Sequence, residues 1–177
     1  MCSSEKCYME RALELAEYAA SLGEVPVGAV IVHKPTGNII GEGWNSREYG
    51  RSPLAHAELM AIENAAKRLG GWRIVDSEMF VTLEPCPMCA GAILQAKLDR
   101  VIFGAYDEKS GSVSSVQRMF EFAYNHKPEV TAGFMEEECR AVLKEFFRAL
   151  RRRKKETGTF WRKEMSKAAQ RAAECEK

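Results

Sequence analysis

The chain has 177 residues, a length that a single domain usually accounts for. Its hydrophobic fraction of 46% and charged fraction of 29% are those of a globular protein, which excludes a disordered or collagen-like chain. No run approaches the roughly 18 uncharged apolar residues of a membrane span, and residues 1–11 lack the apolar stretch of a secretory signal. We therefore expect an intracellular protein, in a reducing cytoplasmic setting, that makes no contact with a membrane.

The net charge of +1 conceals an uneven distribution. Residues 1–139 hold 13 Lys and Arg against 20 Asp and Glu, a net charge of −7, whereas residues 140–177 hold 13 basic against 5 acidic residues, a net charge of +8. An acidic body with a basic C-terminal segment indicates contact with a polyanion, most simply a nucleic acid. A solvated helix rich in Lys and Arg explains the same charge equally well.

Hydrophobic periodicity and turn residues predict the elements of the first half of the chain. They are a helix over 5–22, a hairpin of strands 25–32 and 39–44 around a turn at 34–38, a polar loop over 47–54, and a helix over 55–69. The first helix ends at Gly23 and the last one before Gly70, as helices commonly do.

The second half continues the alternation of strands and helices. We expect a strand over 78–83, a helix over 88–96, a strand over 101–105, a loop over 107–111, a loop or short helix over 113–124, a brief strand over 130–132, a long helix over 136–157 and a more polar helix over 161–175. In the long helix, the inward residues are predicted to be Cys139, Val142, Leu143, Phe146, Phe147 and Leu150. This order predicts an α/β protein, a three-layer α/β/α sandwich with a central mixed sheet.

Two short segments carry the candidate chemistry, 56–58 (His-Ala-Glu) and 85–89 (Pro-Cys-Pro-Met-Cys), each at the start of a predicted helix. The Cys-x-x-Cys pair alone is typical of metal ligands or of a redox pair. Together, His56, Cys86 and Cys89 supply three ligands that suit zinc. Three protein ligands leave the fourth tetrahedral position for water, which distinguishes a catalytic zinc from a structural one.

Glu58 follows His56 by two residues, and residues two apart do not share a helix face. We therefore predict that Glu58 does not bind the metal that His56 binds, and that it acts as a base toward water and substrate. Each segment alone is a weak signal. Their combination is the known signature of the zinc nucleobase deaminases, so it identifies the class by resemblance.

Further stretches of the sequence extend this similarity well beyond the metal motif. They are residues 24–30, 41–45, 55–58, 81–92, 100–105, 107–111, 125–126 and 138–139. With them, the chain resembles the bacterial tRNA adenosine deaminase family from about residue 8 to residue 155. It departs from the family at Leu54, where Thr is common, and over residues 112–124.

The resemblance implies a cytidine deaminase-like fold and hydrolytic deamination of adenosine to inosine at the wobble position of tRNA. It implies one Zn²⁺ per subunit, held by His56, Cys86 and Cys89, with Glu58 as the proton shuttle. The residues that it implies in substrate binding are Asn45, Val27, Gly28, Ala29, Asp107, Arg148, Arg151 and Arg152. The implied partners are the anticodon stem-loop of tRNA and a second copy of the chain in a homodimer.

The same resemblance divides the chain into a zinc-dependent deaminase domain over 1–157, which includes the basic helix, and a helical basic tail over 158–177. Two other functions stay open from the residues. A deaminase of free nucleosides or bases shares the metal motif but needs no basic arm. A zinc-stabilised RNA-binding protein without catalysis would have four protein ligands on its metal and no use for Glu58.

Overall fold

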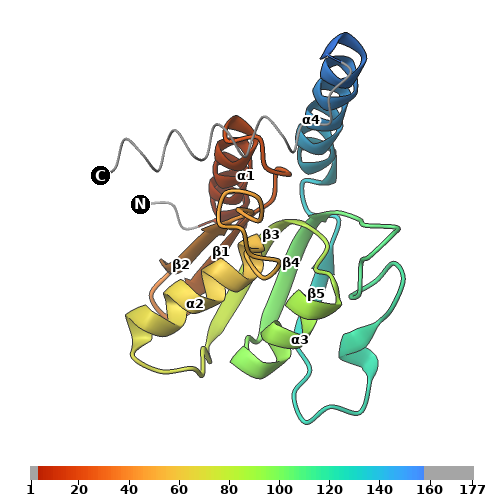
Figure 1. Ribbon diagram of the computed structural model, residues 1–177. Helices are drawn as coiled ribbons and strands as arrows, with labels where there is room; N and C mark the ends of the chain where they lie inside the picture. Colours follow the sequence, from red (N-terminus) through yellow and green to blue (C-terminus); the bar gives the residue numbers. More distant parts are fainter. Residues whose placement is uncertain (1–3, 158–177) are drawn as a thin grey trace.

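The structure, a computed structural model, describes residues 4–157. Its centre is a five-stranded sheet with the order β2-β1-β3-β4-β5 (Figure 1). The strands are β1 (Gly28–His33), β2 (Asn38–Trp44), β3 (Ser77–Leu83), β4 (Arg100–Ala105) and β5 (Glu129–Ala132). The helices are α1 (Glu5–Ser21), α2 (Ala57–Leu69), α3 (Pro87–Ala96), α4 (Glu136–Thr157) and a short 3₁₀ turn, η1 (Met119–Glu121). The predicted helix over 161–175 and the predicted tail over 158–177 lie outside the described residues.

The sheet is mixed, as predicted. Strand β1 is antiparallel to both β2 and β3, whereas β3, β4 and β5 run parallel. Strand β1 begins at Gly28, three residues later than expected. The reason is local, because Pro26 has no N–H to give to a strand ladder and the Val27 N–H bonds back to the Val25 carbonyl at 2.9 Å.

Helices cover both faces of the sheet (Figure 1). One hydrophobic cluster joins one face to α2 and α3, and a second cluster joins the opposite face to α1 and the start of α4. The predicted three-layer α/β/α sandwich is therefore confirmed. Within residues 4–157, no helix is both long and apolar enough to cross a membrane.

Glycines in β2 allow α2 to lie unusually close to the sheet. A Cβ atom on Gly41 would lie 2.3 Å from the carbonyl oxygen of Ala61, and one on Gly43 would lie 2.2 Å from that of Ala57. Only a residue without a side chain fits at such an approach. The first turn of α2, which carries the candidate catalytic residues, is therefore held against β2.

Helix α4 differs from its prediction in how much of it is covered. Cys139 is buried, but Phe147 is 39% exposed and the remaining apolar residues are only half-buried. The prediction that Phe147 points inward is wrong, because Phe147 lies at the edge of the apolar stripe, about 100° around the helix from Phe146, whereas Leu150, further along α4, is half-buried. An apolar stripe indicates which face of a helix can be covered, and it does not say how far the cover extends.

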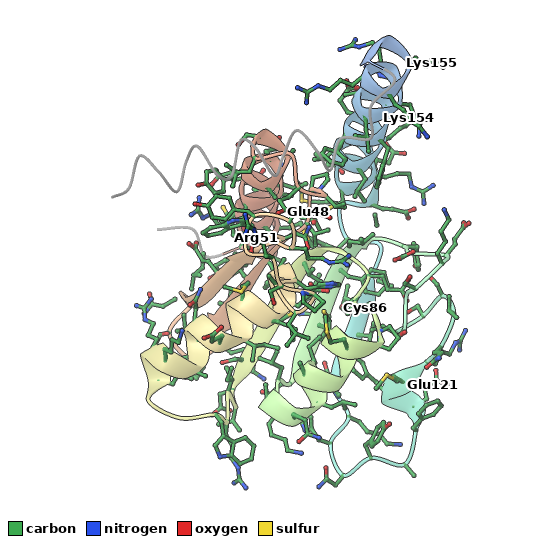
Figure 2. The ribbon with its side chains drawn as sticks, viewed as in Figure 1. Glu48, Arg51, Cys86, Glu121, Lys154 and Lys155 are labelled. Atoms are coloured by element: carbon green, nitrogen blue, oxygen red, sulfur yellow. The ribbon has the colours of Figure 1, made fainter. Side chains whose placement is uncertain are left out.

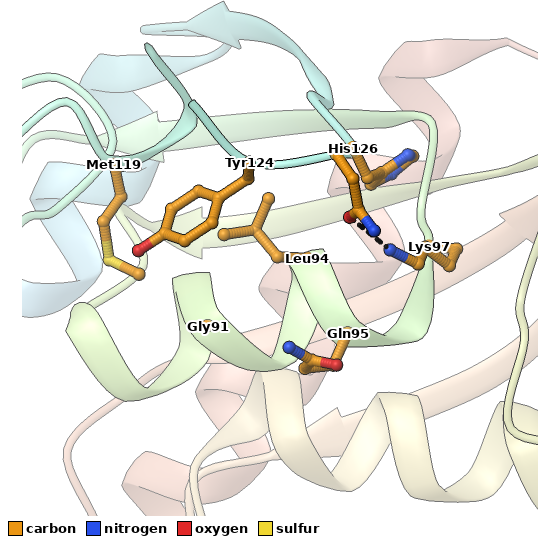
Figure 3. A pocket seen from close by; sticks show the side chains of 8 residues that line it. Gly91, Leu94, Gln95, Lys97, Met119, Tyr124 and His126 are labelled. Carbon is orange, nitrogen blue, oxygen red and sulfur yellow. Dashed lines mark hydrogen bonds between the residues drawn. The ribbon is translucent and has the colours of Figure 1, made fainter. Parts of the chain in front are cut away.

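The segment between β4 and β5 is almost entirely irregular, and its only helical turn is η1. It packs against the outer side of α3 around a small hollow of about 110 Å³ (Figure 3). There, the Lys97 ammonium at the end of α3 donates a hydrogen bond to the Asn125 side chain at 3.1 Å. These contacts lie on α3 itself, so the irregular segment is attached to the helix that opens with the cysteine pair.

Candidate zinc site

The structure brings His56, Cys86 and Cys89 together from the starts of two helices. His56 is the N-cap of α2, Cys86 is the N-cap of α3, and Cys89 lies in the first turn of α3. The two sulfur atoms are 3.6 Å apart, and the His56 Nδ1 atom is 3.8 Å from the Cys86 sulfur and 3.6 Å from the Cys89 sulfur. Among the described residues, no other His, Cys, Asp or Glu joins this cluster.

This triangle of donor atoms fits a tetrahedral zinc ion. With Zn–S of about 2.3 Å and Zn–N of about 2.0–2.1 Å, tetrahedral ligands place two sulfurs about 3.8 Å apart, and a sulfur and a nitrogen about 3.5–3.6 Å apart. The observed edges agree with these values to within about 0.3 Å. Three donors complete three corners, so the fourth position is available for water or substrate.

The local structure favours a thiolate at Cys86. The N-terminal ends of helices carry positive partial charge, and Pro87 occupies the first position of α3, where its missing N–H costs nothing. The hydrogen bond with Cys89 lowers the pKa of Cys86 to about 4, and the same bond together with burial raises the pKa of Cys89. The hydrogen bond with Cys86 raises the pKa of His56.

Glu58 is the buried acid of the site. It lies in the first turn of α2, only 4% exposed, and its side chain hydrogen-bonds the Cys89 thiol. Burial raises the pKa of its carboxyl. Glu58 reaches this cluster without being one of its three donors.

A second buried carboxylate, Glu24, holds the loop that leads into His56. It is 1% exposed, and its two oxygens accept hydrogen bonds from the Asn45 side chain at 3.3 Å and from the Tyr49 N–H at 2.7 Å. The backbone of Asn45 is fixed as well, since its N–H donates to the Val27 carbonyl at 2.9 Å. Hydrogen bonds therefore connect Asn45 to Val27 and, through Glu24, to the loop before His56.

The predicted stretch 27–29 has two different environments. Val27 and Ala29 are buried in the cluster on the α2 and α3 side of the sheet, the side that carries the site. Gly28 faces the other side, where a Cβ atom would lie only 2.0 Å from the Ala12 carbonyl oxygen of α1. Gly28 is therefore required by the packing of α1, whatever its neighbours contribute to substrate binding.

Asp107 starts a loop that adjoins the cysteine segment. Its Oδ1 atom accepts hydrogen bonds from the N–H groups of Lys109 and Ser110 at 3.0 and 3.2 Å, so its side chain shapes the turn that it begins. Its own N–H donates to Glu84, the buried residue two positions before Cys86.

Glu24 and Glu84 are the two carboxylates that sequence reasoning missed. Both lie in stretches that carry the family resemblance, and each is an isolated charge among apolar residues. A charge in a run of this kind is a signal of a buried, hydrogen-bonded group.

The predicted basic contacts lie apart from this cluster. Arg148, Arg151 and Arg152 are exposed on α4, and Arg148 is ion-paired with Glu145. The basic end of α4, where Lys154 and Lys155 lie, points away from the body of the molecule, and Cys86 lies within that body at the start of α3 (Figure 2). The structure does not bring these arginines beside the three zinc donors of the same chain.

Comparison with known proteins agrees with this geometry. A sequence model of the cytidine and deoxycytidylate deaminase zinc-binding region matches residues 2–105. The chain belongs to this zinc-dependent deaminase family. Within it, the chain is 49% identical to the tRNA-specific adenosine deaminase of Haemophilus influenzae over 148 residues, which cover 83% of this chain and 85% of that protein. That similarity puts the chain in the tRNA-specific adenosine deaminase branch of the family.

Solved structures of the family have the same fold. One, from a study of A-to-I editing by tRNA:A34 deaminases at the wobble position of transfer RNA, has a TM-score of 0.75 and 38% identity, and covers 78% of this chain and 100% of that one. The guanine deaminase of Bacillus subtilis has a TM-score of 0.54 and 30% identity, and covers 69% of this chain and 87% of its own. With the zinc-binding family and the fit of the three donors, the cofactor of this deaminase is zinc.

Proposed function

We propose that this protein deaminates adenosine to inosine at the wobble position of tRNA, with water as the second substrate and ammonia as the second product. The observation that carries the proposal is a three-donor zinc site with one open position, bordered by the buried acid Glu58, in a chain 49% identical to a tRNA-specific adenosine deaminase. A structural zinc site would be closed by a fourth protein ligand and would have no use for such an acid.

The metal-binding residues are His56, Cys86 and Cys89. Zinc, when bound, acidifies a water molecule so that hydroxide is available at neutral pH. The two thiolates neutralise the charge of the ion, so this acidification is weaker than with three imidazole ligands. A base beside the water is therefore needed, and the burial of Glu58 in the first turn of α2 supports its assignment to that role.

Glu58 moves the protons of the reaction. Its carboxylate takes one proton from the attacking water and delivers it to the ring nitrogen next to C6, while the water oxygen forms a bond to C6. Glu58 then passes a second proton from that oxygen to the amine, the C6–N bond breaks, and ammonia leaves. Inosine retains the oxygen from water, so the reaction consumes one water and releases one ammonia.

Asn45, Val27, Ala29 and Asp107 are the residues that we assign to holding the nucleoside and the strand around it. A wobble adenosine lies in a single-stranded loop, so its removal from the stack costs little, and unpaired loops are where proteins read RNA sequence. Phosphate contacts fall to the arginines of α4, and they do not depend on base identity. We place the protein in the cytoplasm with its tRNA, as a homodimer, a state that sedimentation at working concentration tests directly.

The experiment that tests the function compares a tRNA transcript with adenosine at position 34 and a matched transcript with guanosine there, using zinc-loaded protein. We expect inosine at that position in the first transcript from the wild type. Glu58→Ala should retain its zinc and lose activity by a factor of about 10²–10⁴, the usual contribution of a general acid/base.

Free adenosine, cytidine and guanine are the competing substrates. Turnover of one of them without inosine in the tRNA would overturn the assignment of the substrate and leave the deaminase chemistry. Loss of zinc from Glu58→Ala would contradict the assignment of Glu58 as a residue that does not bind metal.

A further inference from the structure

Glu84 is a buried carboxylate side chain enclosed by one loop. It follows β3 directly and is 2% exposed. Its Oε1 atom accepts hydrogen bonds from the N–H groups of Val113, Ser114 and Ser115 at 3.1, 2.7 and 2.9 Å. Its Oε2 atom accepts from the Asp107 N–H at 3.2 Å and from the Ser115 hydroxyl. Both ends of the loop over 107–115 are thus tied to one carboxylate.

Hydrogen bonds compensate the charge of Glu84. Within residues 4–157, no Lys, Arg or His forms an ion pair with it. Instead, four backbone N–H groups and one hydroxyl group donate to its two oxygens. A buried carboxylate without a cation is stable only where its oxygens are fully satisfied, so this loop is built around the charge.

The fit leaves no room for an alternative arrangement. A Cβ atom on Gly111 would lie 2.3 Å from the Oε2 atom of Glu84, so only glycine is accommodated there. The Ser112 N–H donates to the Pro85 carbonyl at 2.9 Å, which joins the same loop to the residue before Cys86. Hydrogen bonds to Glu84 and Pro85 therefore join the loop to the two residues that precede Cys86.

From this arrangement, we propose that Glu84 is a positioning residue for the RNA substrate. Its carboxylate sets the position of Asp107 and its loop relative to Cys86, so that the nucleic acid strand meets a preformed wall when its adenosine reaches the zinc site. The proposal rests on the proposed function, since it assigns the loop over 107–115 to that substrate. Glu84 touches neither the substrate nor the metal, and it acts through Asp107 and the loop.

The test is Glu84→Gln in the full zinc-loaded protein. The amide keeps one acceptor oxygen, but its NH₂ group cannot accept the hydrogen bond from the Asp107 N–H. We expect KM for the tRNA with adenosine at position 34 to rise about tenfold while kcat stays within about threefold, the pattern for an interaction that binds ground state and transition state alike. The zinc content should equal that of the wild type.

Glu78→Gln is the matched control. Glu78 lies on β3, the strand that Glu84 follows, half-buried and 3.4 Å from Arg100, and it makes no hydrogen bond to the loop over 107–115. Its substitution should leave KM unchanged. A wild-type KM in Glu84→Gln, or a fall in kcat at unchanged KM, would overturn the positioning role.

Two further measurements separate this test from a failure of the proposed function and from misfolding of the variant. If the wild type formed no inosine, the proposed function would fail, and direct binding of the same tRNA, which needs no turnover, would still show whether Glu84→Gln weakens affinity about tenfold. If Glu84→Gln did not fold, Ser115→Ala would replace it, since it removes only the hydroxyl donor. We expect a two- to threefold higher KM for Ser115→Ala, of the size of about one neutral hydrogen bond, and a wild-type KM there would overturn the proposal.

Discussion

The side-chain amide of Asn45 donates a hydrogen bond to the Oε2 atom of Glu24 at 3.3 Å, and both residues are buried. A carboxylate accepts hydrogen bonds and does not donate them, so it selects which end of the amide faces it. The Nδ2 end therefore turns to Glu24, and the Oδ1 end turns away from it. In the function proposed above, Glu24 thus selects the end of the Asn45 amide that is offered to the nucleoside.

A double-mutant cycle with Glu24→Gln and Asn45→Ala tests this coupling. The amide in Glu24→Gln cannot accept from both the Asn45 side chain and the Tyr49 N–H, so each single variant should lower kcat/KM about 10–100-fold. The double variant should be little worse than the worse single one, because the same interaction is lost in all three. Fully additive losses in inosine formation would contradict the coupling.

The stability of the wild type relative to Glu24→Gln should depend on pH. Burial raises the pKa of Glu24 above its ordinary value of 4.5. At pH values between 4.5 and this raised pKa, the folded state therefore binds more protons than the unfolded state. The free energy of unfolding of the wild type, relative to the variant, should therefore rise as pH falls from about 7 toward 4.5. Urea unfolding across this range measures it. Any effect of pH on zinc binding is common to both proteins and cancels in the comparison. A difference in unfolding free energy that does not change with pH would refute the expectation.

Substitutions of two glycines by alanine should change the stability of the protein in opposite directions, and so test how the helices are packed. Gly28→Ala places a Cβ atom 2.0 Å from the Ala12 carbonyl oxygen of α1, and backbone cannot yield cheaply there, so we expect a loss of about 2 kcal/mol or more. Gly91, in α3, has nothing within 4 Å of an added Cβ. Gly91→Ala should stabilise the protein by about 0.5–1 kcal/mol, the gain in helix propensity. Urea unfolding of zinc-saturated protein compares them, and equal effects would contradict the packing described for α1.

Local signals of the sequence predicted the sheet, the helices that cover it and the zinc donors. The periodicity of apolar residues and the position of turn residues and glycines are visible in the sequence of β2, α2 and β4. The roles of Glu24 and Glu84 were not predictable in this way. Their hydrogen-bond partners lie 21–31 residues further along the chain, so the carboxylates acquire those partners only when the sheet has formed.

The cover of α4 and the path of the segment between β4 and β5 could not be predicted from local sequence signals either. Phe147 continues the apolar periodicity of α4, but periodicity does not report how far around the helix the cover extends. Residues 112–124 have no consistent period, and hydrogen bonds to Glu84 and contacts with α3 fix their path. Tertiary contacts rather than propensity determine these regions.

Removal of the metal should destabilise the folded protein. No zinc site of this kind exists in the unfolded chain, so binding stabilises the folded state by about 4 kcal/mol when free zinc is about 1,000 times the dissociation constant. His56→Ala should lose both zinc and this stabilisation, whereas Glu58→Ala, two residues further on, should keep both. Metal content and Tm with and without a chelator measure the effect. A Tm that does not respond to a chelator in the wild type would argue against a bound ion at these three donors.

The basic end of α4 offers a test of the RNA-binding role that the charge distribution predicts. Arg151 and Arg152 are exposed on α4, so their neutralisation should leave the structure intact. Each phosphate contact releases bound counterions, which lowers the slope of log affinity against log salt by about 0.7–0.9. For the double variant Arg151→Gln/Arg152→Gln, we expect weaker tRNA binding and a slope less negative by about 1.5.

Lys67→Gln provides the matched control, because Lys67 is an exposed cation at the far end of α2, ion-paired with Glu63 at 2.6 Å. Its slope should equal that of the wild type. Deletion of residues 148–177 should make the slope still less negative than the double variant does, since the deleted segment carries most of the basic charge of the C-terminal region. Wild-type slopes in both the double variant and the deletion would assign this segment a solvating role, and tRNA recognition would then fall to the two loops that Glu24 and Glu84 hold beside the zinc site.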